Sequence, residues 1–170
     1  NIEYAPNLQW RGVIPLSKLM SDKFGVPTVI TNDANAAAIG EMTYGAARGM
    51  KNFIMITLGT GVGSGIVIDG KLVYGHDGFA GELGHTCSIR NGRLCGCGRH
   101  GCLEAYASAN GVARTAKEIL QNQNVDSLLR NTPIESITSK DVHYAALQGD
   151  KIALEIFEFT GKILGEAMAD

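Results

Sequence analysis

Three cysteines fall within eight residues of this sequence, in the segment Cys95-Gly96-Cys97-Gly98-Arg99-His100-Gly101-Cys102. Three thiolates and one imidazole make up the tetrahedral Cys₃His arrangement that is common in structural zinc sites. We prefer His85 as the fourth ligand, because His100 lies inside the loop and would be strained in reaching back; His100 is the alternative. Cys87 is then a spare thiol, which we expect to be buried. The predicted zinc ligands are His85, Cys95, Cys97 and Cys102, and the competing interpretation is a Gly-rich loop of surface cysteines.

Two carboxylates are tied to the same predicted zinc site. Glu82 lies three residues before His85, and Glu104 lies two residues after Cys102. A pair of carboxylates beside an imidazole can hold a polyol through several charge-assisted hydrogen bonds. Two solvated glutamates are the alternative, but their shared anchoring to one metal favours a ligand-binding role.

Asp33 has the position of both a helix cap and a catalytic base. It follows the β-branched segment Val26–Thr31 and precedes the small-residue segment Ala34–Ala47. A carboxylate there can cap the helix. A carboxylate at the end of a strand can also take the proton from a hydroxyl that attacks phosphorus. The two roles are compatible, because a cap fixes the direction of the side chain.

The segment Leu58–Gly63 is a glycine-rich turn between two apolar segments. Main-chain amides freed by glycine can cradle phosphate oxygens, and Thr60 adds a hydroxyl donor. The same pattern is equally typical of a plain structural turn. It is not a Walker loop, because the Gly-Lys-Ser/Thr ending is missing.

Periodicity and turn residues define the elements that position these groups. The expected helices are residues 15–24, 34–47, 103–107, 111–121, about 140–147, and 152–169. The expected strands are residues 26–31, which should be buried, and 53–58, 62–69 and 71–74. Asp69-Gly70 is a hairpin signal, so the last three strands should form an antiparallel meander. A Rossmann unit is excluded, because a strand rather than a helix follows the glycine-rich loop.

Composition narrows the class of protein further. Of the 170 residues, 45% are hydrophobic and 19% charged, and the net charge is -2. We therefore expect a cytoplasmic globular protein that binds no nucleic acid through this segment and no membrane. The chain begins at Asn1 rather than Met and ends at Asp170 within a helical pattern, so we interpret it as a fragment. The domain boundary is expected between Thr31 and Asn52, crossed by the predicted helix.

Taken in order, these motifs resemble the ROK family of sugar kinases and repressors over nearly the whole chain. The matching segments are Asn7–Trp10 with Val13–Leu16, Asn32–Ala38, Leu58–Gly63, Gly78–His85 and Cys95–Glu104. The resemblance implies an α/β, actin-like ATPase fold with two domains and a cleft between them. Residues 1–50 would end the small N-terminal domain, and residues 51–170 would begin the larger C-terminal domain.

The resemblance also implies roles for individual residues. Asp33 would be the base that deprotonates the 6-hydroxyl of a hexose, with glucose as the default, and His85 would serve both zinc and sugar. The implied substrate ligands are Asn32, Asp33, Gly78, Glu82, His85 and Glu104. The implied contacts to the nucleotide phosphates are Gly59, Thr60 and Gly61. Magnesium would accompany ATP, and the full-length protein would be a homodimer.

Two family features fall outside this sequence: a first phosphate loop, Asp-x-Gly-Gly-Thr, and the part that completes the adenosine pocket. We therefore expect the isolated chain not to phosphorylate sugar. The alternatives are a kinase for N-acetylglucosamine or N-acetylmannosamine, and a sugar-sensing repressor with an upstream helix-turn-helix.

Overall fold

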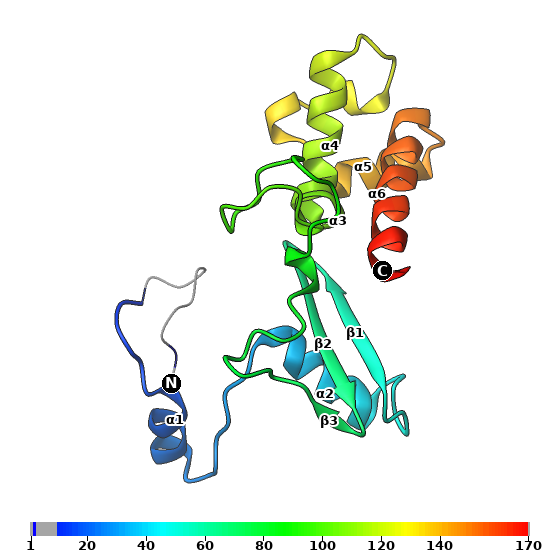
Figure 1. The fold of residues 1–170 in the computed structure, drawn as a ribbon. Coiled ribbons are helices and arrows are strands. Elements are labelled where there is room, and N and C mark those ends of the chain that lie inside the picture. Colours follow the sequence, from blue (N-terminus) through cyan, green and yellow to red (C-terminus); the bar gives the residue numbers. More distant parts are fainter. Residues whose placement is uncertain (1, 3–9, 170) are drawn as a thin grey trace.

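The computed structural model describes residue 2 and residues 10–169 (Figure 1). The part of the family resemblance that falls on Asn7–Gln9 lies outside the described residues. The α-helices are α1 (Leu16–Phe24), α2 (Asp33–Tyr44), α3 (Glu104–Ala107), α4 (Ala109–Asn122), α5 (Ser139–Leu147) and α6 (Lys151–Ala169). The strands are β1 (Phe53–Leu58), β2 (Val62–Ile68) and β3 (Lys71–Leu72), and the short 3₁₀ helices are η1 (Leu83–His85), η2 (Leu128–Asn131) and η3 (Ile134–Ser136). None of the described helices is both long and apolar enough to cross a bilayer.

The three strands form the predicted antiparallel meander, in the order β1-β2-β3. Thr57 pairs with Gly63 and Met55 with Gly65 across the first two strands. Asp69 and Gly70 join β2 to β3 with φ angles of 52° and 72°. Two successive positive φ values are what a tight two-residue hairpin requires, which explains the Asp-Gly sequence.

Helix α2 packs closely on β2 because both elements present small residues. A Cβ added at Gly63 would lie 2.9 Å from the Ala34 Cβ, and one added at Gly65 would lie 2.7 Å from the Ala38 Cβ. Ala34 and Ala38 are almost fully buried. The two glycines are two residues apart and therefore face the same side of the sheet. Their lack of side chains sets how near the start of α2 comes to the strand.

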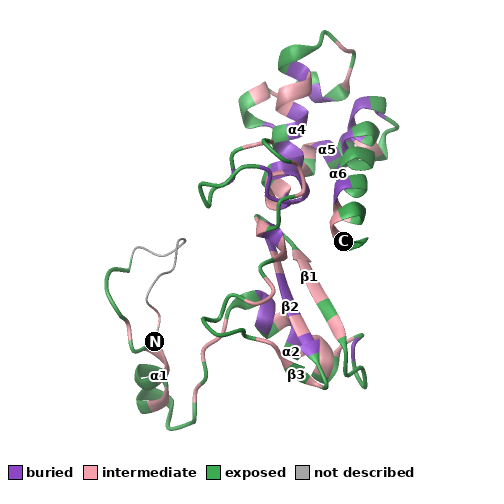
Figure 2. Cartoon of the chain, in the orientation of Figure 1, coloured by how far each residue is buried: buried purple, intermediate pink, exposed green. Residues whose placement is uncertain are grey.

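The second part of the molecule is helical and has its own core (Figure 2). Helix α4 crosses α5 and α6, and the buried side chains between them come mainly from these three helices. The largest members are Leu120, Leu129, Ile137, Val142, Ile152 and Ile156. A smaller cluster joins this part to the sheet, because Ile163 of α6 packs with Val62 of β2 and with Leu103 and Tyr106. The helices predicted here are confirmed, with ends that differ by one or two residues.

The buried strand predicted for residues 26–31 was wrong. No described segment pairs with it, and Val29 is 86% exposed. A β-branched run favours extended backbone, but a strand forms only when another strand satisfies its hydrogen bonds. The segment instead links α1, which has no buried residue, to α2.

Candidate functional site

The four predicted zinc ligands lie together. One donor atom from each of His85, Cys95, Cys97 and Cys102 falls within 4.8 Å of the others. The Cys97 and Cys102 sulfurs are 3.6 Å apart, and the Cys95 sulfur is 3.8 Å from His85 Nδ1. Three soft thiol donors and one imidazole are the donor set that zinc prefers, so the residues fit this metal. Zinc binding itself stays a prediction.

The choice between the two histidines follows from the folded loop. His85 sits at the end of η1 beside the thiols, and its carbonyl accepts a hydrogen bond from the Arg99 guanidinium at 3.0 Å. The Nδ1 of His100 instead lies 2.9 Å from the Gly92 carbonyl oxygen. His100 is thereby held away from the thiol cluster.

The three thiols differ in acidity. Hydrogen bonds from the Arg99 backbone and side chain lower the pKa of Cys97 to about 6. Burial raises the pKa of Cys102 to about 12, and burial also raises the pKa of Cys95. Metal ligation requires the thiolate, so the lowered pKa of Cys97 favours binding, whereas burial of Cys95 and Cys102 opposes the loss of their protons.

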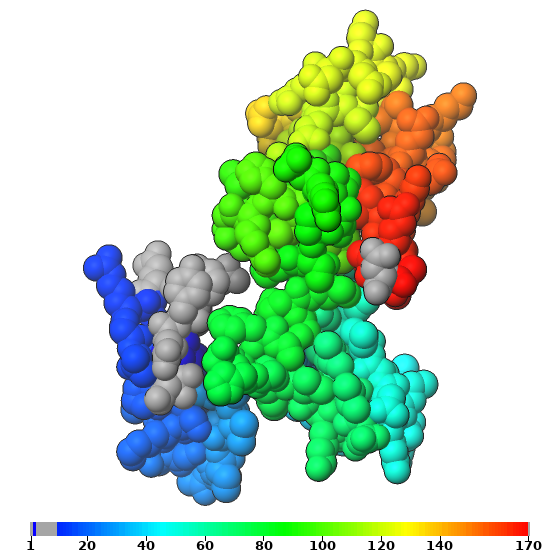
Figure 3. Space-filling view, viewed as in Figure 1, coloured from blue at the N-terminus to red at the C-terminus, as the bar shows by residue number. Residues whose placement is uncertain are grey.

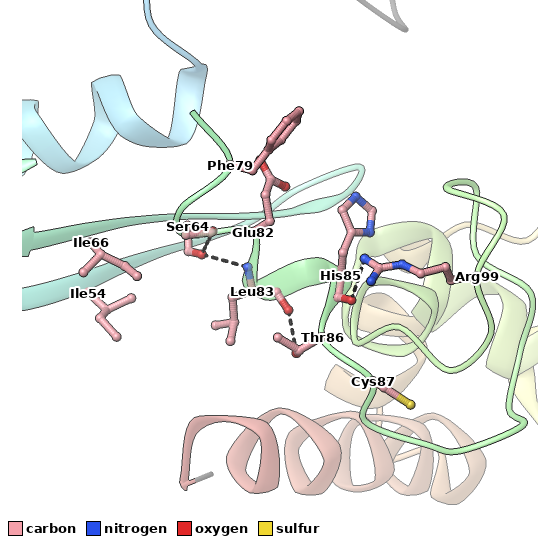
Figure 4. Close-up of a pocket in the computed structure, with 11 residues that line it drawn as sticks. Ile54, Ser64, Ile66, Phe79, Glu82, Leu83, His85, Thr86, Cys87 and Arg99 are labelled. Atoms are coloured by element: carbon pink, nitrogen blue, oxygen red, sulfur yellow. Dashed lines mark hydrogen bonds between the residues drawn. The ribbon is translucent and has the colours of Figure 1, made fainter. Parts of the chain in front are cut away.

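A polar-rimmed hollow of about 570 Å³ lies beside the cluster (Figure 4). His85 lines it and also belongs to the thiol cluster, as the predicted double role requires. The other lining residues are Ile54, Ser64, Ile66, Phe79, Gly81, Glu82, Leu83, Thr86, Cys87 and Arg99. In the space-filling view, the green segment that carries most of these lining residues lies between the cyan part of the chain and the yellow-to-red helices (Figure 3). The hollow combines apolar walls with a carboxylate, an imidazole and a guanidinium, a composition suited to a polar organic ligand.

Ser64 positions the segment that carries Glu82, and sequence reasoning missed it. The buried hydroxyl of Ser64 donates to the Gly81 carbonyl and accepts from the Leu83 amide at 3.2 Å. Gly81 has a φ of 85°, and a Cβ there would lie 2.9 Å from the Ser64 carbonyl oxygen. The sequence signal was a polar residue within an otherwise apolar strand.

Asn32, not Asp33, caps α2. The Asn32 side chain accepts from the Asn35 amide at 2.9 Å, and Asp33 is the first helical residue, its Oδ1 2.9 Å from the Ala34 amide. The predicted cap was thus off by one position. Both residues are exposed, and neither lines the hollow. Their helix nevertheless begins against Gly63 of β2, and Gly81 packs on the adjacent Ser64.

The glycine-rich turn is bonded to α4 and to the cysteine-bearing loop of residues 93–104, which we call the knuckle. The Gly59 carbonyl accepts from the Ala109 amide at 2.9 Å, and the Thr60 carbonyl accepts from the Asn110 side chain at 3.2 Å. Glu104 Oε2 accepts from the Val62 amide at 3.0 Å. With these contacts in place, the Thr60 residue remains exposed.

Glu104 is placed differently from Glu82. It lines a second hollow of about 220 Å³, together with Thr60, Cys95 and Asn110, rather than the hollow that Glu82 lines. Its carboxylate also touches the position where a Gly61 side chain would begin. Glu104 therefore bridges the knuckle and the turn.

Gly78 and Cys87 were also singled out in the sequence. Gly78 has a φ of 82° with open space around it, and it lies outside the first hollow. The expectation that Cys87 is buried was wrong, because it is exposed at the edge of that hollow. Cys87 faces Cys102 in an isolated antiparallel bridge, and of the two residues it is Cys102 that is buried.

Arg93 is a structural anchor that the sequence did not reveal. Its guanidinium lies over the Tyr106 ring, 4.6 Å from the centroid, and forms an ion pair with Glu118 of α4. It also donates to the Ala105 carbonyl at 3.1 Å and the Thr115 hydroxyl at 2.9 Å. Burial raises the pKa of Glu118, but hydrogen bonds from Arg114 and Arg93 outweigh it and leave that pKa below its ordinary value. The knuckle loop is thus held onto α4.

A thiol–imidazole cluster with the donor set of a metal site, a polar hollow and a glycine-rich turn thus lie together on this meander and form the candidate functional site. The whole chain, residues 1–170, matches the ROK family. It is 42% identical over 171 residues to a glucokinase of Halalkalibacterium halodurans, covering 99% of this chain and 52% of that relative. The chain therefore belongs to the ROK family, and it spans about half the length of the curated relatives it matches.

Solved structures agree with this assignment. A ROK family glucokinase from Streptomyces griseus, in complex with glucose and AMPPNP, superposes with a TM-score of 0.82 at 42% identity, covering 98% of this chain and 55% of that one. A ROK family transcriptional regulator, a homologue of the E. coli MLC protein, gives a TM-score of 0.84 at 31% identity, covering 96% and 40%. The predicted family and the actin-like ATPase fold class are confirmed.

Proposed function

We propose that the full-length protein transfers a phosphoryl group from ATP to the 6-hydroxyl of a hexose, with glucose as the preferred substrate. The proposal is supported by the similarity to glucokinases at about 42% identity. It is also supported by the hollow that Glu82 and His85 line, because a carboxylate beside an imidazole suits a polyol.

The observation that carries the proposal is the packing around Gly63–Gly65 of β2. The helix that begins with Asp33 approaches Gly63, and Gly81, next to Glu82, packs on Ser64. The segments that carry Asp33 and Glu82, the base and the sugar ligand of this proposal, therefore pack on one short stretch of strand. A catalytic group held on rigid elements is the arrangement that proton transfer in phosphoryl transfer needs.

In this proposal each group has one role. Asp33 takes the proton of the attacking hydroxyl, and Thr60 with its neighbours faces the phosphates. The remaining sugar ligands are Asn32, Gly78, Glu82, His85 and Glu104, and the remaining phosphate contacts are Gly59 and Gly61. The zinc ligands His85, Cys95, Cys97 and Cys102 would hold the metal, which orders the loop and orients His85. Magnesium would enter with ATP and offset phosphate charge.

Other features of the full-length protein belong to the same proposal. They are a domain division near residue 50, a homodimer and a cytoplasmic location. We also propose that the 170-residue chain alone is inactive, with phosphorylation requiring the full-length protein.

Replacing Asp33 tests the proposal. In the full-length protein, Asp33→Asn removes the base while keeping the size of the side chain, so turnover should fall by about 100-fold or more. Sugar affinity, measured by calorimetry, should change little, because the base acts chiefly in the transition state. Near-normal turnover in a coupled ADP assay would show that Asp33 is not the base.

A sugar-sensing repressor is the second candidate, and the similarity to the ROK transcriptional regulator favours it. This function predicts that the wild-type full-length protein binds sugar but releases no ADP in its presence. The glucokinase function predicts ADP release that depends on both sugar and magnesium. One assay of the wild-type protein therefore separates the two.

A further inference from the structure

Cys87 lies directly opposite Cys102 in a short antiparallel bridge. Hydrogen bonds flank the pair on both sides: Ser88 N to the Gly101 carbonyl at 2.8 Å, and Leu103 N to the Thr86 carbonyl at 3.0 Å. The two cysteines are therefore a non-hydrogen-bonded pair, in which facing Cα atoms are about 4.5 Å apart and side chains leave the same face. That spacing is within the range spanned by disulfides, about 4.4–6.8 Å.

The two thiols differ in access. Cys87 is exposed and lines the hollow beside His85 and Arg99, whereas Cys102 is 1% exposed and belongs to the metal cluster. The Cys87 sulfur lies beside Gly101, the residue next to Cys102, at 3.4 Å from the position of an added Cβ. Within this pair, an oxidant in solution therefore reaches Cys87 before Cys102, and Cys102 is placed as the resolving thiol behind it.

We propose that Cys87 and Cys102 form a reversible disulfide, and that its formation takes Cys102 out of the metal-binding set. Cys87 is then a site of oxidative modification, and the knuckle has an oxidised form that keeps only three of its four ligands. This inference goes beyond the proposed function and does not depend on sugar phosphorylation.

A peroxide supplies the oxidant. The Cys87 thiolate attacks one oxygen of hydrogen peroxide, which forms the sulfenic acid and expels hydroxide. The Cys102 sulfur then attacks the Cys87 sulfur, the S–S bond forms, and a second hydroxide leaves. Two protons, from the thiols or from solvent where Cys102 enters as a zinc thiolate, convert the hydroxides to water. Two sulfurs lose one electron each, and the O–O bond gains two.

The disulfide would also act on the neighbouring turn. Glu104 is two residues from Cys102 and accepts the Val62 hydrogen bond that holds the end of the glycine-rich turn. A shift of Cys102 toward Cys87 pulls on this contact. A thiol reductant reverses the bond by exchange and returns Cys102 to the cluster.

Peptide mapping of the zinc-loaded full-length protein after peroxide treatment tests the inference. Trypsin separates the thiols, because Cys87 falls in residues 72–90, Cys95 and Cys97 in residues 94–99, and Cys102 in residues 100–114. We expect a cross-link between 72–90 and 100–114 under non-reducing conditions, formed together with zinc release to a chromogenic chelator. Dithiothreitol should abolish the cross-link.

The matched control is Cys87→Ser, which leaves all four predicted ligands in place. It should bind zinc as the wild type does, lose the cross-link, and release zinc several-fold more slowly under peroxide. The inference is overturned if oxidised wild type shows a bond within 94–99, a link of 94–99 to 100–114, or only sulfinic acid at Cys87. It is also overturned if Cys87→Ser releases zinc as fast as the wild type.

Discussion

The helical region (residues 109–169) and the site region (residues 53–107) are held together by different means. Helices α4, α5 and α6 enclose a continuous cluster of buried aliphatic side chains. The site region has a smaller cluster, and its loops are fixed by glycines and by side chains that bond to backbone, such as Ser64, Arg93 and Glu104. Three of its four predicted zinc ligands stand in a loop with little regular structure.

This difference shows that stability and the candidate site are assigned to different regions of the molecule. An apolar core is non-directional and tolerates many sequences of similar volume. A set of hydrogen bonds and metal ligands is directional, so each member fixes a particular geometry. The helical region therefore serves as support, and the site region depends on a few directional contacts.

Loss of one predicted zinc ligand should loosen the structure of the site region and leave the structure of the helical region unchanged. Cys97→Ser should lower zinc affinity by more than about 100-fold, since loss of even an outer partner of a ligand costs about 10–100-fold. Hydrogen exchange should rise in residues 83–104 and stay slow in α4 and α6. Elemental analysis and exchange mass spectrometry measure both, with Cys87→Ser as the control that retains zinc. Stoichiometric zinc in Cys97→Ser would contradict the ligand assignment.

Shortening a buried side chain in the helical core should have the opposite effect: it should lower the stability of the protein and leave zinc binding unchanged. Ile156 is fully buried in α6, so Ile156→Ala should lower the free energy of unfolding by about 2–5 kcal/mol. Leu154, on the same helix, is 50% exposed, and Leu154→Ala should change stability by less than about 0.5 kcal/mol. Urea unfolding followed by circular dichroism gives both values. Zinc content should be unchanged in the folded state, and its loss would show that the two regions are not separable.

The sequence predicted local features well and contacts between distant segments poorly. The helices after Gly101 and the meander follow from periodicity and from the Asp69-Gly70 turn, which are short-range signals. The clustering of the His and Cys side chains was also predictable, because the three thiols lie in one loop.

What escaped prediction depends on contacts between segments far apart in the chain. The hydrogen bond from Val62 to Glu104 spans 42 residues, and the ion pair from Arg93 to Glu118 spans 25. No local pattern reports such partners. The predicted strand 26–31 failed for the same reason, since a strand is decided by its neighbour rather than by its own residues.

The close approach of α2 to β2 links the start of α2 to the site region, and a substitution can disturb it directly. A Cβ at Gly65 would lie 2.7 Å from that of Ala38, so Gly65→Val should cost about 1–3 kcal/mol through overpacking. Gly161 of α6 has no atom within 4 Å of an added Cβ, and Gly161→Ala should instead stabilise by about 0.5–1 kcal/mol. Thermal denaturation of both variants measures the contrast, and equal effects would mean that the strand is not tightly packed.

The smallest expected change in stability comes from removing one charge, that of Asp150, in the helical region. The Asp150 carboxylate accepts hydrogen bonds from the Leu128 amide at 2.6 Å and from the Ala153 amide at 2.9 Å. These two bonds connect η2 to the start of α6. Burial raises the pKa of Asp150, but these hydrogen bonds outweigh it and hold the pKa below its ordinary value of 3.8.

A depressed carboxyl pKa contributes stability above its unfolded value, and that contribution is lost as the pH falls through the folded value. Asp150→Asn keeps a capping oxygen but removes the charge, so it should cost about 0.3–1 kcal/mol at pH 7, and the difference from wild type should shrink below pH 3.8. Asp126→Asn, at a nearby exposed position, is the control and should change stability by less than about 0.5 kcal/mol. Urea unfolding at a series of pH values measures the difference, and a cost for Asp150→Asn that stays constant into acid would show that the carboxylate charge does not stabilise this junction.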